Sequence, residues 1–124
     1  MTVLKVTTDD RIIPLEISGS LDSICKEIGG YERVRPRGLP AEYCMLVDDM
    51  GLLKVKPINV VGSVLYETLK HGQPIAGDIL LVRYEQYNGF EGLSPSDVEL
   101  LKKMCEKLVS VYNVGEVSAS VGQV

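Results

Sequence analysis

The sequence predicts a single α+β domain in which helices cover one face of a mostly antiparallel sheet and a long helix follows at the C-terminal end. Three observations lead to this fold class. Apolar segments with strand character are separated by turn-forming residues, two short segments have helical spacing of their apolar residues, and a longer helical pattern comes last. At 124 residues, the chain has room for one hydrophobic core.

Two strands are expected at the start of the chain, over residues 2–7 and 11–17. Asp9 and Asp10 favour a turn between them. Because Pro14 has no backbone N–H to donate to a neighbouring strand, we expect the second strand to lie at an edge of the sheet or to carry a bulge.

A short helix is expected over residues 21–28. Ser20 is a good N-cap residue, and apolar residues then recur at helical spacing along one face. Gly29 and Gly30 end the helix, because glycine readily takes the left-handed conformation found at helix C-termini.

Three more strands are expected in the middle of the chain. They cover residues 31–37, 42–47 and 52–56. The turn at residues 48–51 joins the last two strands as a hairpin.

A second helix is expected to begin after its N-cap residue Asn59 and to end at Gly72. Its apolar face includes several valines, which have a low intrinsic helix propensity. The apolar run at residues 79–84 then reads as a central strand.

A glycine-containing loop at residues 87–93 leads into the C-terminal helix, which the segment at 94–97 (Ser-Pro-Ser-Asp) is expected to start. Apolar residues then repeat at helical spacing as far as Tyr112. We therefore divide the chain into a core at 1–86, a loop and helix at 87–115 that close the core or pack on a dimer partner, and a flexible tail at 116–124.

Composition limits the classes of function. The formal charge of −4 argues against broad binding to DNA or RNA, which needs a basic surface. No apolar run approaches the roughly 20 residues that span a bilayer, and the N-terminus lacks the pattern of a secretion signal. The three cysteines are odd in number and widely spaced, which is typical of a reducing compartment. We expect a cytoplasmic protein that does not act at a membrane.

Several motifs occur together in the order found in a known family. They are the run at 17–31, the Asp-Asp-x-Gly turn at 48–51, the Pro-x-Asn at 57–59 and the Gly-Asp-x-Leu-Leu-Val strand at 77–82. Over residues 12–85 the chain resembles a small uncharacterised domain carried by bacteriophages and related mobile elements. The family usually has arginine where this chain has Val60. The resemblance implies an accessory protein that acts on host physiology or host defence, without indicating a chemistry.

Arg33, Arg35 and Arg37 alternate along an expected strand. Residues two apart share a face of a strand, so their guanidinium groups would line one side over roughly 13 Å. Such a row is unfavourable unless water, carboxylates or an anionic ligand meets it, and guanidinium groups suit phosphate oxygens. With Tyr31 to stack on a base, this segment is a candidate site for a nucleotide or another phosphorylated molecule. The alternative is a solvated strand face that pairs with neighbouring acids.

Lys54 and Lys56 show the same alternation on another expected strand, so five cations could converge if the two strands are neighbours. As the alternative, these lysines keep an edge strand soluble. Asn59 joins the candidate residues through its place in the motif that carries the family resemblance.

Arg83, Tyr84 and Phe90 form a further cluster, where a strand runs into the glycine-flanked loop that also carries Tyr87 and Asn88. Exposed aromatic residues beside arginine are typical of interfaces and stacking sites. Alternatively, Phe90 packs into the hydrophobic core at the point where the last helix begins.

The sequence contains no recognisable catalytic, metal-binding or phosphate-loop motif. His71 is the only histidine and has neither a nucleophile motif nor a second metal ligand nearby in the chain. The three cysteines, Cys25, Cys44 and Cys105, fit buried apolar positions. We therefore expect a protein that is not an enzyme and holds no cofactor.

The leading hypothesis is a homodimer or larger oligomer that sequesters a small phosphorylated ligand, such as a host nucleotide signal used in defence. The alternative is an inhibitor or adaptor that docks on a host protein through the C-terminal helix and the aromatic loop. A small hydrolase ranks last. The candidate ligand-binding residues are Tyr31, Arg33, Arg35, Arg37, Lys54, Lys56, Asn59, Arg83, Tyr84 and Phe90.

Overall fold

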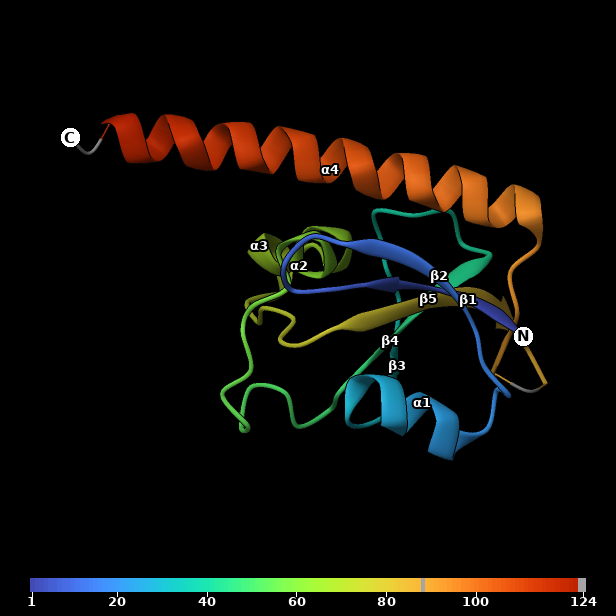
Figure 1. Ribbon diagram of the computed structural model, residues 1–124. Coiled ribbons are helices and arrows are strands. Elements are labelled where there is room, and N and C mark those ends of the chain that lie inside the picture. The colour runs from blue at the N-terminus through green and yellow to red at the C-terminus, as the bar shows by residue number, and fades with distance from the viewer. Residues whose placement is uncertain (88, 123–124) are drawn as a thin grey trace.

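Over residues 1–87 and 89–122, which the computed structural model describes, six strands form one antiparallel sheet with helices packed against it (Figure 1). This is the α+β fold class that the sequence predicts. In chain order the elements are β1 (Thr2–Val6), β2 (Ile12–Glu16), α1 (Leu21–Ile28), β3 (Glu32–Val34), β4 (Tyr43–Val47), α2 (Val60–Tyr66), α3 (Thr68–His71), β5 (Ile79–Glu85), β6 (Gly89–Glu91) and α4 (Pro95–Gly122).

The strand order is β2-β1-β5-β4-β3, and β6 pairs with β5 outside this path. β5 is the central strand, as its apolar sequence predicts. β2 lies at an edge of the sheet, which confirms the position expected from Pro14. Because β1 is the only strand that β2 pairs with among the described residues, the missing N–H of Pro14 can face away from the sheet without disrupting the ladder.

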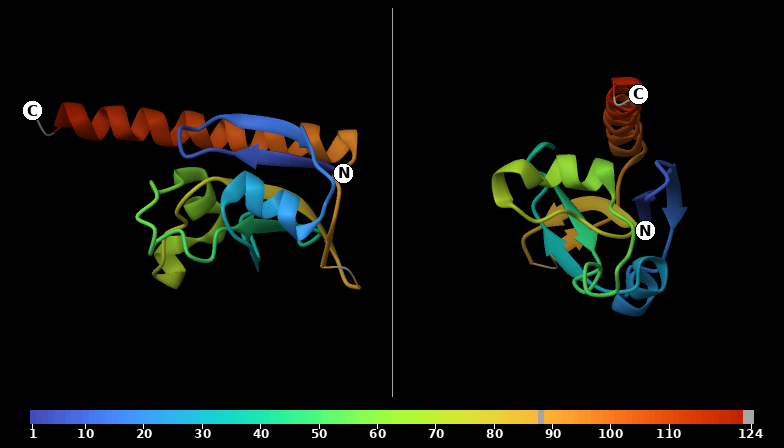
Figure 2. Two further views of the ribbon diagram at one scale, coloured as in Figure 1. Left: turned by 60° about the horizontal axis from the view of Figure 1, so that its bottom comes forward. Right: turned by 90° about the vertical axis from the view of Figure 1, so that its left-hand side faces the viewer.

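The sheet is buried on both faces. Met45 of β4 packs in one apolar cluster with Val61 of α2 and Leu101 of α4. Leu46, the next residue of β4, belongs to a second cluster with Ile24 of α1. The expectation that helices cover one face is therefore wrong for α1, which lies opposite α2 and α4 (Figures 1 and 2). The continuous apolar runs of β4 and β5 account for this, because both of their faces need cover.

The ends of α1 follow the sequence prediction. The Ser20 hydroxyl accepts a hydrogen bond from the N–H of Ser23, at 3.1 Å. Gly29 ends the helix in the left-handed region, with φ of 88°. Cys25 lies on the exposed side of α1, so the expectation that it is buried is wrong.

The start of α4 is also as predicted. The Ser94 hydroxyl accepts from the N–H of Asp97 at 3.1 Å, and the Asp97 carboxylate accepts from the N–H of Ser94 at 2.9 Å. Farther along, Leu101 and Cys105 are fully buried in the core. The N-terminal half of α4 therefore closes the core.

The expected hairpin strand at 52–56 is wrong, since this segment forms consecutive turns. Val55 has φ of 57°, in the left-handed region, which interrupts an extended chain. The expected strand at 31–37 is reduced to β3, which ends at Val34. Pro36 lacks the N–H needed to continue the ladder, and its carbonyl instead accepts from Leu39 in a turn.

The second expected helix is divided into α2 and α3. Glu67, with φ of 60°, separates them, and α3 ends at Gly72 as predicted. Leu69 projects from α3 and is fully exposed, so it is not part of the expected apolar face.

The C-terminal part of the chain differs from the expectation in two ways. The loop expected at 87–93 includes the short strand β6. The helix expected to end near Gly115 continues to Gly122, because a glycine inside a helix costs only about 1 kcal/mol. The tail expected at 116–124 is therefore mostly part of α4, and residues 123–124 lie outside the described residues.

Candidate functional site

Arg33 and Tyr84 meet across the sheet. Arg33 lies on β3, opposite Leu46 of β4, and this register directs its side chain to the face that α1 covers. Its guanidinium carbon lies 5.4 Å from the centroid of the Tyr84 ring on β5. This distance is within the range of a cation–π contact. Strand β4, which lies between β3 and β5, brings these two residues together.

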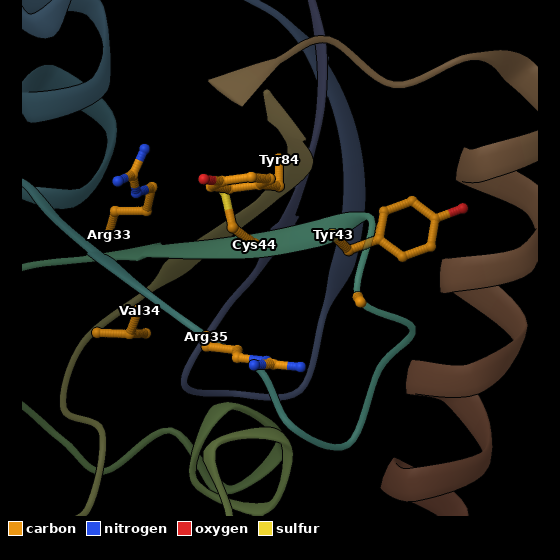
Figure 3. Close-up of a pocket in the computed structure, with 7 residues that line it drawn as sticks. Arg33, Val34, Arg35, Tyr43, Cys44 and Tyr84 are labelled. Carbon is orange, nitrogen blue, oxygen red and sulfur yellow. The ribbon is translucent and has the colours of Figure 1, made fainter. Parts of the chain in front are cut away.

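A cavity of about 470 Å³ opens beside this pair. Figure 3 shows the Tyr84 ring over Cys44 with Arg33 next to it, while Arg35 lies apart from them, beyond the end of β3. The volume is within the range of small-molecule sites. The cavity is lined by Arg33, Val34, Arg35, Ala41, Tyr43, Cys44 and Tyr84.

The cavity has a local positive charge. Both Arg33 and Arg35 are exposed, and within residues 1–87 and 89–122 neither forms an ion pair. The chain as a whole carries a formal charge of −4. These two arginines lie at one cavity without carboxylate partners in the described part of the chain, and they could bind an anion.

Two of the residues that line the cavity, Cys44 and Tyr43, have raised pKa values. Burial raises the pKa of the Cys44 thiol to about 11, although nearby Arg33 partly opposes the shift. Burial also raises the pKa of Tyr43 to about 12, and its hydrogen bond to Asp97 adds to this effect. Both shifts favour the neutral forms of the two side chains.

Arg83 lies on the opposite face and has a structural role. Its Nη1 lies 2.8 Å from the Asp97 carboxylate, and its Nε lies 3.7 Å from that of Glu91. Its guanidinium also lies over the ring of Tyr43, at 5.7 Å. Arg83 does not line the cavity, although its neighbour Tyr84 does.

Lys54 and Lys56 do not join the arginines. Their Nζ atoms lie 2.9 and 2.6 Å from the buried carboxylate of Asp48. They also donate to the carbonyls of Gly29 and Ile28, at the C-terminal end of α1. The five cations, whose convergence depended on two neighbouring strands, therefore do not come together, because the lysines neutralise a buried acid and the end of a helix.

Asn59 is fully buried and its amide is already bonded within the protein. Its Nδ2 donates to the carbonyls of Val6 and Gly77, both at 3.0 Å. Its Oδ1 accepts from the N–H of Gly62 at 2.8 Å, as the N-cap of α2. Asn59 therefore connects α2 to the chain before β5 and to the end of β1.

The remaining candidates lie outside the cavity lining. Tyr31 packs against Phe90 with ring centroids 6.1 Å apart, and both are partly buried beside α1. Phe90 thus packs on the face away from α4, not beneath the start of that helix. Arg37 is exposed in the turn after Pro36. Asn88 falls outside the described residues.

The match to a family model covers most of the chain. Residues 1–106 match the model of a domain of unknown function, DUF3846. The chain belongs to the DUF3846 family. The match includes every residue that lines the cavity and extends beyond the range of 12–85 expected from the sequence motifs. No curated protein and no solved structure matches the chain.

Two further findings bear on this DUF3846 domain. In the described part of the chain, no cluster of three or more histidine, cysteine or acidic side chains is placed to bind a metal ion. Over the same residues, no helix has both the length and the apolar character needed to cross a membrane.

Sequence reasoning missed four residues that line the cavity of this DUF3846 domain. They are Val34, Ala41, Tyr43 and Cys44. Cys44 pairs with Val82 two residues before Tyr84, so it shares a face with Tyr84 and Arg33. The continuous apolar run of β4 does not show which of its residues line the cavity, because that depends on the order and register of the strands, which are long-range properties.

Proposed function

We propose that this DUF3846 protein is a non-enzymatic binding protein that captures a small phosphorylated ligand at the cavity beside Arg33. The observation that carries the proposal is the pair of exposed arginines, Arg33 and Arg35, without carboxylate partners among the described residues, at one 470 Å³ cavity. Guanidinium groups bind phosphate oxygens through charge-assisted, often bidentate, hydrogen bonds.

A nucleotide suits the other surfaces of the cavity. Tyr84 is 46% exposed, so part of its ring is open for contact with a base or sugar. Val34, Ala41 and Cys44 supply an uncharged surface next to the arginines. The cavity therefore has a positively charged part and an uncharged part. A ligand with one anionic end and one flat, weakly polar end fits both.

We further propose a cytoplasmic accessory protein of a bacteriophage or mobile element that acts as a homodimer or larger oligomer and sequesters a host nucleotide signal used in defence. The resemblance of residues 12–85 supports this origin. All three cysteines are free thiols, in agreement with a reducing compartment.

Isothermal titration calorimetry and native mass spectrometry test the ligand. Linear and cyclic nucleotides are compared with the unphosphorylated nucleosides and with inorganic phosphate. We expect a phosphorylated nucleotide to bind and its nucleoside not to bind. In the Arg33→Ala/Arg35→Ala variant, affinity falls by about 100-fold or more, because two charge-assisted contacts are lost.

The matched control is Arg11→Ala/Lys102→Ala, which removes the same charge at two exposed residues that do not line the cavity. Its affinity remains within about threefold of wild type, since exposed ion pairs such as Arg11 with Asp9 contribute little. Equal losses in both double variants, or no uptake of any nucleotide at millimolar concentration, would contradict the proposal.

The second candidate function is an inhibitor or adaptor that docks on a host protein. Tyr87, between β5 and β6, is 90% exposed, and Leu100 of α4 is 44% exposed. Removing α4 is not a usable test, because Leu101 and Cys105 complete the core. Tyr87→Ser with Leu100→Ser keeps the core intact, and loss of a host protein from pull-downs with this variant would favour the adaptor.

A further inference from the structure

The cavity beside Arg33 lies at a place where one strand extends beyond its neighbour. β3 ends at Val34, opposite Met45, whereas β4 already begins at Tyr43. This first part of β4 pairs with β5 on one side and extends past the end of β3 on the other. Pro36 follows where β3 would have to continue, and it has no N–H to donate to a ladder. The cavity is therefore built against an edge of β4 that β3 leaves uncovered.

Residues from both faces of the sheet line this cavity. Cys44 belongs to the apolar cluster on the face that α1 covers, whereas Tyr43 belongs to the cluster on the opposite face. In Figure 3, Arg33 lies with the Cys44 side chain on one side of the β4 ribbon, and Arg35 lies on the other side. The two arginines therefore flank the edge of β4 and do not lie together on one face.

Arg33 is held on its own side of this edge. Its guanidinium carbon lies 5.4 Å from the centroid of the Tyr84 ring. The backbone of β6 is also close, since a Cβ added at Gly89 would collide with Nη1 of Arg33. Moving this guanidinium across the edge of β4 would therefore break its contacts with both β5 and β6.

The backbone on either side of Arg35 is held as well. Val34, the residue before it, pairs with Met45 in the sheet. Pro36, the residue after it, is buried, and its carbonyl accepts from the N–H of Leu39 at 2.9 Å. The Arg35 side chain itself is exposed and forms no ion pair within the described residues. The fold thus presents a second guanidinium group across the edge from the first.

We propose that the ligand captured at this cavity is a nucleotide with phosphates at two separate positions of its sugar, one bound by Arg33 and the other by Arg35. This inference rests on the proposed function and gives its ligand a second anionic group. A single phosphate would reach both guanidinium groups only if Arg33 left Tyr84 or Arg35 turned over the edge of β4. Two phosphates joined through a sugar need neither movement, and each makes its own charge-assisted contact.

Isothermal titration calorimetry with matched pairs of nucleotides tests this class of ligand. For each common ribonucleoside, the 3′,5′-bisphosphate is compared with the 5′-diphosphate, which carries the same number of phosphates at a single position. We expect the bisphosphate of the preferred nucleoside to bind at least about 10-fold more tightly, because only the bisphosphate reaches both arginines. Equal affinities, or tighter binding of the 5′-diphosphate, would overturn the inference.

Single substitutions test whether each arginine holds its own phosphate. The 5′-monophosphate and the 3′-monophosphate of the same nucleoside are titrated into Arg33→Ala and into Arg35→Ala. We expect Arg33→Ala to weaken one monophosphate about 10-fold and to leave the other within about threefold of wild type, and Arg35→Ala to do the reverse. Loss of the same monophosphate in both variants would show that the two arginines share one phosphate, and it would overturn the inference.

The matched control is Arg37→Ala, which removes the same charge in the turn after Pro36. Arg37 is exposed and does not line the cavity, so affinity for every probe should stay within about threefold of wild type. All three arginines are exposed, so circular dichroism spectra and thermal midpoints of the variants should remain those of wild type. A loss of affinity in Arg37→Ala as large as that in Arg33→Ala would overturn the inference, because a general attraction between charges would explain it.

The failure of this inference differs from the failure of the proposed function. If a phosphorylated nucleotide binds and the Arg33→Ala/Arg35→Ala variant loses it, but the bisphosphate has no advantage, the binding protein stands and the ligand with two separate phosphates is overturned. If no nucleotide binds at millimolar concentration, the proposed function is overturned and this inference with it.

Discussion

The carboxylate of Asp97, in the first turn of α4, accepts a 2.6 Å hydrogen bond from the hydroxyl of Tyr43 on β4. The same oxygen lies 2.8 Å from Nη1 of Arg83. The other oxygen accepts from the N–H of Ser94, so this carboxylate joins the capped helix to two strands of the sheet. Burial opposes ionisation of Asp97, but these donors outweigh it and lower its pKa to about 2.

Acid should weaken this connection. The pKa of Asp97 is about 2 in the folded protein against an ordinary value of 3.8, so its contribution to stability is fully present above pH 3.8. That contribution is lost as the pH falls from 3.8 to about 2. We expect Asp97→Asn to lower the free energy of unfolding at pH 7 by on the order of 2 kcal/mol. Urea unfolding at pH 7 and pH 2.5 measures this, and a difference from wild type that stays constant between the two would contradict it.

Lys56→Met should destabilise the protein without affecting ligand binding. Its Nζ is the closer of the two cations that neutralise the buried Asp48, whose pKa is about 2 because hydrogen bonds from Lys56 and Lys54 outweigh burial. We expect a loss of about 2 kcal/mol at pH 7, with Lys54 retaining part of the pairing. Lys102→Met is the exposed control. If Lys56→Met binds a nucleotide more weakly than Lys102→Met does, Lys56 contributes to ligand binding and the prediction is contradicted.

Asn59→Ala should cost about 3 kcal/mol of stability. It removes the N-cap of α2 and leaves the carbonyls of Val6 and Gly77 without the Asn59 donor. Asn59→Ser restores the cap acceptor and should recover about 1 kcal/mol. Chemical denaturation separates the two contributions, and equal stabilities of the two variants would show that the cap contributes nothing.

Gly89→Ala should displace Arg33. A Cβ at position 89 would lie within 2.4 Å of Nη1 of Arg33, and Gly89 has φ of 89°, which disfavours alanine. We expect a loss of about 1 kcal/mol of stability and a nucleotide affinity between those of wild type and the Arg33→Ala/Arg35→Ala variant. An affinity equal to wild type would mean that the position of Arg33 next to Tyr84 does not affect binding.

Cys25 should be the single fast-reacting thiol. It is exposed, whereas burial raises the pKa of Cys44 to about 11 and that of Cys105 to about 12. Titration of the native protein with a thiol-reactive disulfide should give one equivalent rapidly and the other two only on unfolding. In Cys25→Ser the fast equivalent should disappear, and its persistence would show that a core thiol is accessible.

The candidate site was only partly predictable from the sequence. The alternation of arginines in the sequence singled out Arg33 and Arg35, which both line the cavity. The predicted row of three arginines on one strand face is wrong, because β3 ends at Val34 and Arg37 lies in a turn. Lys54 and Lys56 show the same alternation, yet they contact Asp48. Local spacing cannot distinguish these outcomes, because the partner of a charged side chain depends on which distant segments the fold brings together.

The sequence by itself determined several features of this protein: the Ser20 cap of α1, the Ser94–Asp97 start of α4, the choice of an edge or a bulge for β2, and the α+β class. Each depends on residues within a few positions or on the backbone chemistry of proline. Only the tertiary structure decided that α1 covers the second face of the sheet and that Arg33 lies against Tyr84. It also decided that Leu53 and Val55 face outward. These features follow from strand order and from competition for buried partners, which act between residues far apart in the chain.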